Sequence, residues 1–485
     1  MKKPAVRPYS SVLRRWVSAL IPITTAVAAL AAVSPVAPAL AQQTGGTRHP
    51  VELIKLIPIN GTAANPTNKM VTFDISWVDQ TNGLYYLADR SNAAIDVVDT
   101  TGAFTGTPDT LLGQIGGSIF KFAGARASND DSGPNGVTSF VHQGGGNCIF
   151  VTDAPSRVVS INGNVSFVQE ANEVSTGGTK RADELAYDPA DGLLLVINNA
   201  DDPPFGTLIR VDKSTCRLST IGKINLTSAG TNGLVNATNG AEQPVWDPGT
   251  QHFYLAIPEV NGPGGGGPNG GVASITTGGT VDKFFPINFC QPSGLALGPN
   301  GDLLVNCSTV FDFGGQACKA VVPAPSPAGT PPAAPATCAG IANPLVAICN
   351  PSRGCTPSNG SLAAVFGIGG GDEAWFNGGD GRYYVTAANL PLGPSLGAVS
   401  SSRAALIANG ETPNFLFQLL PTLPPVPAIP GVRGAGTVHS VAANSTLNKI
   451  YVPLPANNVY SIASDGGTLA AACVQGCIAV YAGLE

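Results

Sequence analysis

The sequence predicts an all-β protein, a β-propeller of seven four-stranded blades. One pattern returns along the chain: an acidic residue, a short apolar segment, a turn and an aromatic-rich strand, as in Glu242–Ile257, Asp74–Asp89 and Asp183–Val196. The 485 residues include 60 Gly and 41 Pro, the usual turn formers, and 43% are hydrophobic. No helical periodicity separates the copies, which favours four-stranded units stacked around an axis.

Seven copies follow one another when each is aligned at the residue that opens it. These opening residues are Asp74, Asn135, Asp183, Glu242, Ser293, Asp372 and His439. The first and last lie 365 residues apart, so the six steps average about 61 residues, longer than the roughly 40 to 50 of common propeller repeats. Loops account for the excess. Six or eight blades stay open, because the 79-residue step from Ser293 to Asp372 could hide a degenerate copy.

Each copy is expected to supply about four strands. Third strands are predicted at Ala94–Asp99, Arg157–Ile161, Thr207–Asp212 and Val459–Ile462, and an outer strand at Lys283–Ile287. In the last copy Cys477–Tyr481 is a candidate closing strand, and Val51–Ile59 could serve the same blade. Such closure removes the free sheet edges that invite aggregation.

The first 41 residues have the composition of a signal peptide. They contain five basic residues and no acid, and an apolar run from Trp16 to Val33 precedes the small residues of Ala39–Ala41. Arg14 and Arg15 are also a faint cue for twin-arginine export. We therefore expect an exported protein, periplasmic or extracellular, in which residues 42–485 form a single propeller domain.

The charge of the exported chain limits its partners. Removal of the five basic residues changes the formal net charge from −6 to −11. An acidic chain is a poor candidate for binding nucleic acid or an anionic membrane, so the expected partner is an unidentified protein or small molecule. No other apolar run reaches about 18 residues, so we expect no transmembrane segment after signal cleavage.

Ten cysteines, an even number in an exported chain, favour disulfide bonds. Cys290 and Cys307 flank a predicted hairpin and could pair across it, and a second pair, Cys473 and Cys477, could close a tight loop. Residues 308–360 are rich in Pro and Ala, and we interpret them as a disulfide-pinned insertion in blade five. This stretch contains Cys318, Cys338, Cys349 and Cys355.

The seven opening residues are expected to meet at one mouth of the central channel, and four of them are carboxylic acids. Converging carboxylates repel one another, so either some keep a proton or a divalent cation, Ca²⁺, Mg²⁺ or Mn²⁺, lies among them. The alternative is a merely hydrated mouth whose polar side chains cap turns. Glu184 and Glu373 each follow a ring acid, so strand alternation predicts that they face away and pair with Arg or Lys between blades.

Two short motifs carry a family resemblance. Tyr384–Ala387 and Phe150–Asp153 resemble the repeat of the YVTN type of seven-bladed bacterial propeller. Glu242–Pro248 is similar to the Glu-Gly-Pro-x-Trp opening of the SMP-30/gluconolactonase family, and Pro134–Gly136 looks like its Pro-Asn-Gly. The second resemblance implies that Glu242 and Asn135 bind a divalent cation that polarises a sugar-lactone ester. The remaining acidic role would then fall to Asp74, Asp183 or Asp372.

Two functions of different classes follow, and the fold does not choose between them. One is a binding or scaffold protein, and the other is a metal-dependent hydrolase of lactone-like small substrates. In the hydrolase, the cation would act as Lewis acid on the carbonyl oxygen, while Asp372 or His439 would deprotonate the attacking water. A lone histidine can equally be a hydrogen-bonded structural residue. Binding is favoured, because the sequence contains no complete catalytic set.

Overall fold

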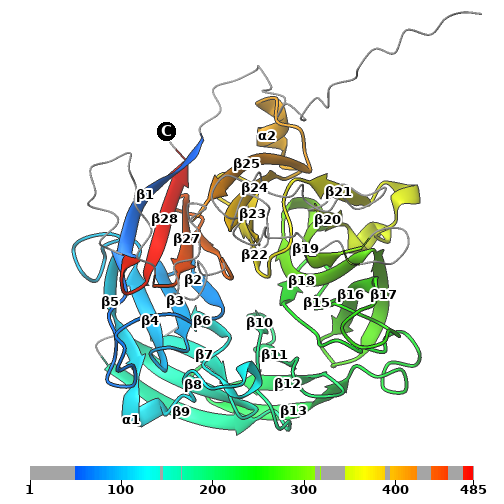
Figure 1. Ribbon diagram of the computed structural model, residues 1–485. Helices are drawn as coiled ribbons and strands as arrows, with labels where there is room; N and C mark the ends of the chain where they lie inside the picture. The colour runs from blue at the N-terminus through cyan, green and yellow to red at the C-terminus, as the bar shows by residue number, and fades with distance from the viewer. Residues whose placement is uncertain are drawn as a thin grey trace, which may run out of the picture. The chain divides into compact units, whose positions relative to one another are not determined.

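The computed structural model describes residues 50–142, 146–164, 167–311, 317, 345–387, 394–422, 438–456 and 473–483. These residues belong to one compact unit, residues 46–485. They form seven four-stranded antiparallel sheets that follow one another around a common centre (Figure 1). The predicted seven-bladed, all-β propeller is therefore confirmed.

The first four blades are formed by consecutive strands. Blade 1 contains β2 (Ser76–Asp79), β3 (Leu84–Asp89), β4 (Ala94–Asp99) and β5 (Thr110–Gly116). Blade 2 contains β6 (Val137–Val141), β7 (Asn147–Asp153), β8 (Arg157–Asn164) and β9 (Phe167–Ser175). Blade 3 contains β10 (Leu185–Asp188), β11 (Leu193–Asn198), β12 (Phe205–Val211) and β13 (Leu218–Asn225). Blade 4 contains β14 (Pro244–Asp247), β15 (His252–Ile257), β16 (Asn269–Thr276) and β17 (Val281–Asn288).

The remaining blades complete the circle. Blade 5 contains β18 (Cys290–Leu297), β19 (Leu303–Val310), β20 (Leu345–Cys349) and β21 (Leu362–Phe366). Blade 6 contains β22 (Ala374–Asn377), β23 (Arg382–Ala387), β24 (Ser395–Ser400) and β25 (Phe415–Pro421). Blade 7 contains β26 (Ala442–Asn444), β27 (Lys449–Leu454), β28 (Cys477–Gly483) and β1 (Val51–Pro58). Short helices occur at α1 (Gly117–Phe120), α2 (Ala404–Ala408), η1 (Asn129–Asp131), η2 (Pro299–Gly301), η3 (Pro351–Arg353) and η4 (Pro357–Asn359).

Blade 7 is built from both ends of the described chain. Strand β1 pairs antiparallel with β28, which pairs with β27, so the outermost strand of the last blade comes from the N-terminal side. The prediction that Val51–Ile59 serves this blade is thus confirmed. The third position, expected for Val459–Ile462, is occupied by β28, and residues 457–472 lie outside the described part. Pairing between the two ends leaves no blade short of a strand.

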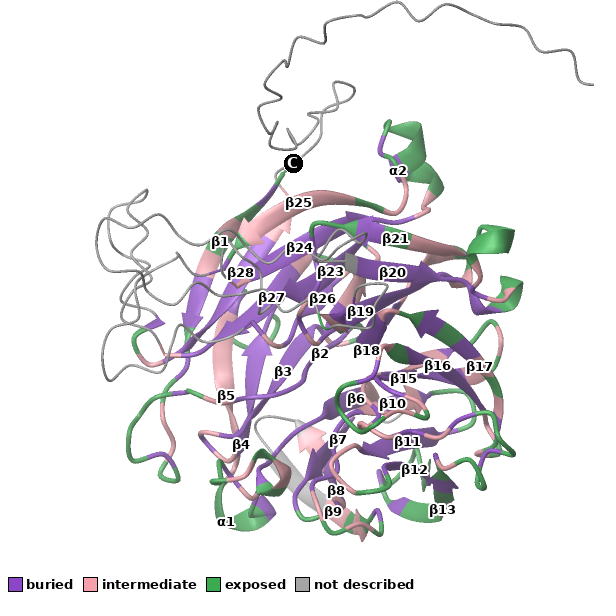
Figure 2. Ribbon diagram, turned by 45° about the vertical axis from the view of Figure 1, so that its right-hand side comes forward, coloured by how far each residue is buried: buried purple, intermediate pink, exposed green. Residues whose placement is uncertain are grey.

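A separate hydrophobic cluster fills each of the seven interfaces between neighbouring blades. Between blades 1 and 2, for example, Tyr86 and Ile95 belong to the same cluster as Val151 and Val159. Both faces of the middle strands are therefore covered, and all six residues of β3 are buried. This explains why the second strand of each copy has a nearly continuous apolar sequence. The outermost strands, such as β5 and β25, are only half-buried (Figure 2).

An aspartate or asparagine ends the innermost strand in most blades. The Oδ1 atoms of Asp79, Asp188, Asp247 and Asn377 each accept a hydrogen bond of 2.8–3.0 Å from the backbone N–H two residues later. This side-chain turn reverses the chain into the second strand. The Asp-Pro-Gly and related turns of the repeat are therefore a local device of the innermost hairpin.

Four disulfide bonds occur among the described residues: Cys148–Cys216, Cys290–Cys307, Cys349–Cys355 and Cys473–Cys477. Two of them confirm predicted pairs, a third joins two of the four cysteines expected in the insertion, and the fourth, between blades 2 and 3, was not expected. Disulfide bonds in this number are typical of proteins from oxidising compartments outside the cytoplasm. No helix in the described part of the chain has the length and apolarity needed to cross a membrane.

The stretch expected as an insertion in blade 5 contains part of the blade itself. Residues 345–349 form β20, the third strand, which pairs with β19 and β21. Its short apolar sequence, Leu-Val-Ala-Ile-Cys, is that of a strand buried on both faces. Residues 318–344, including Cys318 and Cys338, lie outside the described part.

Two buried acids in blade 1 should make the free energy of unfolding depend on pH. Asp89 and Asp96 are fully buried, and Asp96 Oδ1 accepts a 2.7 Å hydrogen bond from Gln114. Burial raises the pKa of Asp89 to about 6, and burial together with the charge of Asp89 raises the pKa of Asp96 well above its ordinary value. Both pKa values exceed those of the same groups in the unfolded chain. The contribution of the two protonated acids to stability is therefore fully present below the unfolded pKa, and it is lost as pH rises through the folded pKa values.

Asp96→Asn is therefore expected to increase the free energy of unfolding at pH 8 by about 2 kcal/mol, and by clearly less at pH 5. Urea denaturation at the two pH values measures the difference. The exposed Asp191 supplies the matched control, since Asp191→Asn should change the free energy of unfolding slightly and by the same amount at pH 5 and pH 8. An Asp96→Asn effect that does not change between pH 5 and pH 8 would contradict the prediction.

Candidate functional site

Backbone hydrogen bonds place the opening residues at equivalent positions. The N–H groups of Asp74, Asn135, Asp183 and Glu242 each donate to a carbonyl of the second strand in the same blade, at 2.8–2.9 Å. Neighbouring blades are linked at the same level, because the N–H of the following residue donates to an opening residue of the next blade. Such bonds join Ile75 to Asn135, Gln243 to Ser293 and Glu373 to His439. We call the seven opening residues the channel ring.

Arg90 occupies one side of the channel ring. This buried residue follows β3, and its guanidinium forms an ion pair with Asp74. Its Nε donates to Asn135 Oδ1 at 2.8 Å, and its Nη1 donates to Asn129 Oδ1 at 2.8 Å. The Asn135 amide nitrogen donates to the carbonyl of Ala182 at 2.8 Å. Two of the expected metal ligands, Asp74 and Asn135, therefore hold an arginine in this structure.

A second arginine engages a third expected ligand. Arg181 Nη2 donates to Asp183 Oδ2 at 2.8 Å, and its Nε donates to Asn199 Oδ1 at 3.3 Å. Asn199 in turn donates to Glu242 Oε2 at 3.3 Å. Sequence reasoning missed both arginines, although Arg181 lies only two residues before a ring acid and Arg90 lies directly after a second strand. These two positions in the sequence were the available signal, because both place the arginine near the expected channel mouth.

His439 bridges two acids of the channel ring. Its Nε2 lies 2.6 Å from Asp74 Oδ1, and its Nδ1 lies 3.3 Å from Asp372 Oδ2. Burial opposes protonation of the imidazole, but the two carboxylates outweigh it and raise the pKa of His439 to about 9. Burial also opposes ionisation of Asp74, yet Arg90 and His439 hold the pKa of Asp74 below its ordinary value. The two predicted catalytic residues, His439 and Asp372, are thus brought into contact.

Two further acids converge on Asp372 beside this network. Glu184, Glu242 and Asp372 each bring one carboxylate oxygen to within 4.8 Å of the others, and we call them the carboxylate cluster. Glu184 is only 4% exposed, and its Oε2 has no hydrogen-bond partner in the described part of the chain. Glu242 and Asp372 are half-buried. The cluster therefore contains the expected ligand Glu242 and Asp372, one of the three candidates for the remaining acidic role, but neither Asn135, Asp74 nor Asp183.

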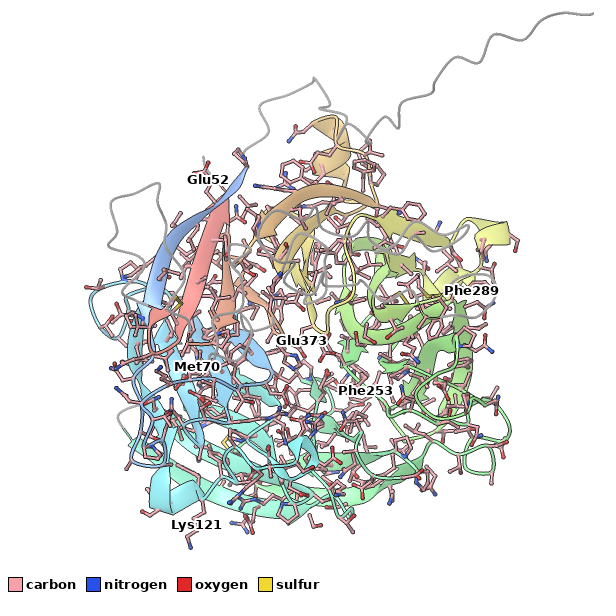
Figure 3. All side chains as sticks on the ribbon, viewed as in Figure 1. Glu52, Met70, Lys121, Phe253, Phe289 and Glu373 are labelled. Carbon is pink, nitrogen blue, oxygen red and sulfur yellow. A yellow bond between two sulfur atoms is a disulfide. The ribbon has the colours of Figure 1, made fainter. Side chains whose placement is uncertain are left out.

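The expected orientation of Glu184 and Glu373 is wrong. Glu184 belongs to the carboxylate cluster, and Glu373 lies beside the centre of the circle of blades (Figure 3). Glu373 Oε2 accepts a hydrogen bond of 3.3 Å from Ser440. Within the described residues, no arginine or lysine forms an ion pair with either acid. Both acids precede the first residue of their strand, at Leu185 and Ala374, so strand alternation does not govern them.

Burial shifts the pKa values of the acids at this end of the channel in one direction. Desolvation, with the charges of Asp372 and Asp183, raises the pKa of Glu242 to about 8. Burial raises the pKa of Glu184 well above its ordinary value and also raises that of Asp372. Burial raises the pKa of Asp183 to about 6, although Arg181 opposes the shift. A pKa of about 8 keeps the Glu242 carboxyl largely protonated at neutral pH unless a cation compensates its charge.

Ser293, the ring residue of blade 5, serves the backbone. Its hydroxyl donates to carbonyl oxygens, at 3.1 Å to Gly371 and 3.2 Å to Asp372. It thereby ties blade 5 to blade 6.

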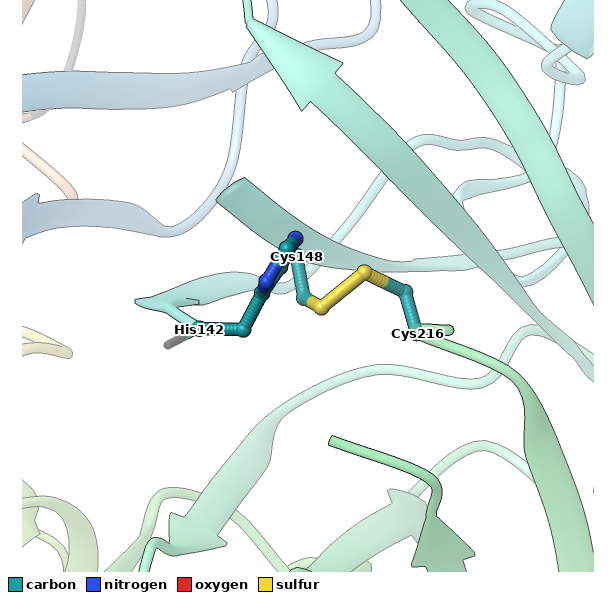
Figure 4. A group of neighbouring side chains, drawn as sticks. All are labelled: His142, Cys148 and Cys216. Carbon is teal, nitrogen blue, oxygen red and sulfur yellow. A yellow bond between two sulfur atoms is a disulfide. The ribbon is translucent and has the colours of Figure 1, made fainter. Parts of the chain in front are cut away.

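A second group with metal-ligand side chains lies between blades 2 and 3. It contains His142, Cys148 and Cys216. The two cysteines form a disulfide bond, with the imidazole beside it (Figure 4). A disulfide sulfur is not the thiolate that a metal requires, so this group is structural.

Comparisons with known proteins support the fold and assign no family. No protein-family model matches the chain, and no curated protein does. Among solved structures, hydrazine synthase from Kuenenia stuttgartiensis is similar with a TM-score of 0.53 and 13% sequence identity, over 81% of this chain and 95% of that chain. A Dos1 propeller has a TM-score of 0.46 and 10% identity, over 89% and 96%. At such identities the similarity concerns the fold alone.

Proposed function

We propose that this protein is a non-catalytic binding protein, exported from the cytoplasm, whose channel holds one divalent cation on Glu184, Glu242 and Asp372. The observation that carries the proposal is the convergence of three carboxylate oxygens within 4.8 Å. Oxygens on one Ca²⁺ ion lie up to about 5 Å apart, because each Ca–O distance is about 2.3–2.6 Å. The buried, unpartnered Oε2 of Glu184 supplies independent support, since an ion would give this atom the partner it lacks.

The distribution of charge supports the same site. Six acids surround this end of the channel, and three cationic side chains oppose them: the two arginines contact Asp74 and Asp183, and the histidine lies between Asp74 and Asp372. The acids are Asp74, Asp183, Glu184, Glu242, Asp372 and Glu373, and the cationic residues are Arg90, Arg181 and His439. Oxygen ligands of this kind suit Ca²⁺, Mg²⁺ or Mn²⁺. The ligand set differs from the expected one, because Glu184 takes the place of Asn135, while Asp372 fills the remaining acidic role.

The metal-dependent hydrolase remains a second candidate, because His439 contacts the cluster through Asp372. The resemblance of Glu242–Pro248 to the gluconolactonase motif favours it as well. However, each ring nitrogen of His439 faces a carboxylate, so neither is directed at a water molecule that it could deprotonate. This geometry suits a histidine that holds two acids together. We therefore prefer binding to hydrolysis.

Elemental analysis of protein purified without chelator tests the proposal. We expect about one Ca, Mg or Mn per chain, lost in Glu184→Gln and in Glu242→Gln. Glu52→Gln, on the periphery, is the matched control and should retain the metal (Figure 3). Absence of stoichiometric metal from the unmodified protein would overturn the proposal. Metal-dependent turnover of lactones, lost in the same two variants, would replace binding by hydrolysis.

A further inference from the structure

The channel contains an open cavity of about 500 Å³, and Glu184 of the carboxylate cluster is one of its lining residues. Its walls come from the innermost strands of the blades, and the exposed residues Gln80, Thr81 and Pro189 lie at the end where these strands turn. The volume is in the range of small-molecule sites, roughly 300 to 1,000 Å³. Six of the lining residues are aromatic: Trp77, Phe140, Tyr187, Trp246, Trp375 and Phe376.

The aromatic walls surround unsatisfied polar atoms. Trp77 and Trp375 pack edge to face, with ring centroids 5.0 Å apart, and both remain half-buried. In the described part of the chain, Trp77 Nε1 and the Tyr187 hydroxyl have no hydrogen-bond partner, and neither does Glu184 Oε2. Buried polar atoms in this state are costly, so a ligand that pairs with them gains free energy.

The charge of the lining selects the kind of ligand. Glu184 stands at the cluster end, and Asp79 stands at the opposite end, where it caps the innermost turn and accepts from Ser139. The described lining contains no lysine, arginine or histidine. The faces of aromatic rings attract cations, and Trp is the strongest of them. An acid and several aromatic side chains around one cavity therefore favour a positively charged ligand with an apolar body.

We propose that this cavity binds an organic ammonium ion, with the charged nitrogen at Glu184 and the hydrocarbon body among the tryptophans. The inference deepens the proposed binding function, on which it rests for the acidic end of the site, and it names the ligand class. Because Glu184 would serve both cations, a divalent ion bound at the cluster should weaken ammonium binding.

Tryptophan fluorescence reports directly on this cavity. The sequence has four tryptophans, of which Trp16 lies in the predicted signal peptide and the other three line the cavity. We would titrate chelator-treated protein with benzylammonium, benzyl alcohol and benzoate, three probes of one shape and different charge. Benzylammonium is expected to bind about tenfold tighter than benzyl alcohol, and benzoate more weakly than both.

Two variants separate the contributions of charge and aromatic surface. Glu184→Gln should reduce the preference for benzylammonium over benzyl alcohol to about twofold or less, while Trp375→Leu should weaken both by about tenfold. Glu52→Gln and Phe415→Leu, at exposed positions of the outermost strands β1 and β25, are the matched controls. If Trp375→Leu fails to fold, as judged by circular dichroism, Trp375→Phe replaces it, with a smaller loss.

The two proposals fail separately in this experiment. Equal binding of the three probes, or a preference unchanged by Glu184→Gln, would overturn the ammonium site even if metal is bound. Preferential benzylammonium binding without any stoichiometric metal would support the ammonium site and overturn the proposed divalent-cation site. Weaker benzylammonium binding after addition of CaCl₂ would support both.

Discussion

Arg90→Met is expected to lower the free energy of unfolding by about 3 kcal/mol, near the lower end of what removal of one partner from a buried ion pair costs. Arg90 and Asp74 are both about 5% exposed at their side chains, so the variant leaves a carboxylate in the channel without its main counter-charge. His439 stays on the other oxygen of Asp74, which limits the loss. The amide oxygens of Asn135 and Asn129 also lose the hydrogen bonds that Arg90 donates to them.

Urea denaturation at neutral pH measures this loss, and Arg353→Met is the matched control. Arg353 lies 3.6 Å from Asp302 but is 60% exposed, so we expect its removal to cost less than about 1 kcal/mol. Adding Asp74→Asn to Arg90→Met should recover part of the loss, because no uncompensated charge then remains. Equal losses for the two arginines would show that the Asp74 ion pair does not stabilise the ring.

The fold was predictable because its signals are local. The turn acid that ends the innermost strand, as at Asp79 and Asp247, bonds to the backbone two residues away, so it marks each hairpin wherever the rest of the chain lies. The apolar second strand likewise follows from burial on both faces, as in β3. These two features, repeated along the chain, indicated seven blades, although six or eight stayed open, and Val51–Ile59 was offered for the last blade because closure removes free sheet edges.

For the site, only the shared position of the opening residues along the channel was predictable from the sequence. The opening residues do lie at equivalent backbone positions, but their partners come from other segments, as Arg90 shows by contacting Asp74, Asn129 and Asn135. Which acids receive an arginine and which remain without one depends on this three-dimensional arrangement. Glu184 escaped prediction for a related reason, since it precedes β10 and follows no strand periodicity.

Disulfide connectivity shows the same limit. Cys290 and Cys307 flank one hairpin, so their proximity follows from local pairing of β18 with β19. Cys148 and Cys216 belong to different blades and meet only because blades 2 and 3 pack together. The spacing of cysteines in the sequence does not predict that packing.

Removal of the Cys148–Cys216 disulfide is the second large effect that we expect. The bond joins β7 of blade 2 to the turn before β13 of blade 3, and it encloses 68 residues of sequence. Restricting a loop of that length in the unfolded chain stabilises the folded state by about 4 kcal/mol in the chain-entropy model. Cys148→Ala combined with Cys216→Ala should lower the free energy of unfolding by that amount.

The Cys290–Cys307 bond is a matched control, because both of its cysteines are equally buried but it encloses only 17 residues. The corresponding double alanine variant should cost about 3 kcal/mol, so the two variants differ by about 1 kcal/mol in the direction of the longer loop. Urea denaturation of both, with the same loss of two buried sulfur atoms, isolates the effect of loop length. A smaller loss for the Cys148–Cys216 variant would contradict the entropic account, and would indicate that blades 2 and 3 are held in register by their hydrophobic cluster alone.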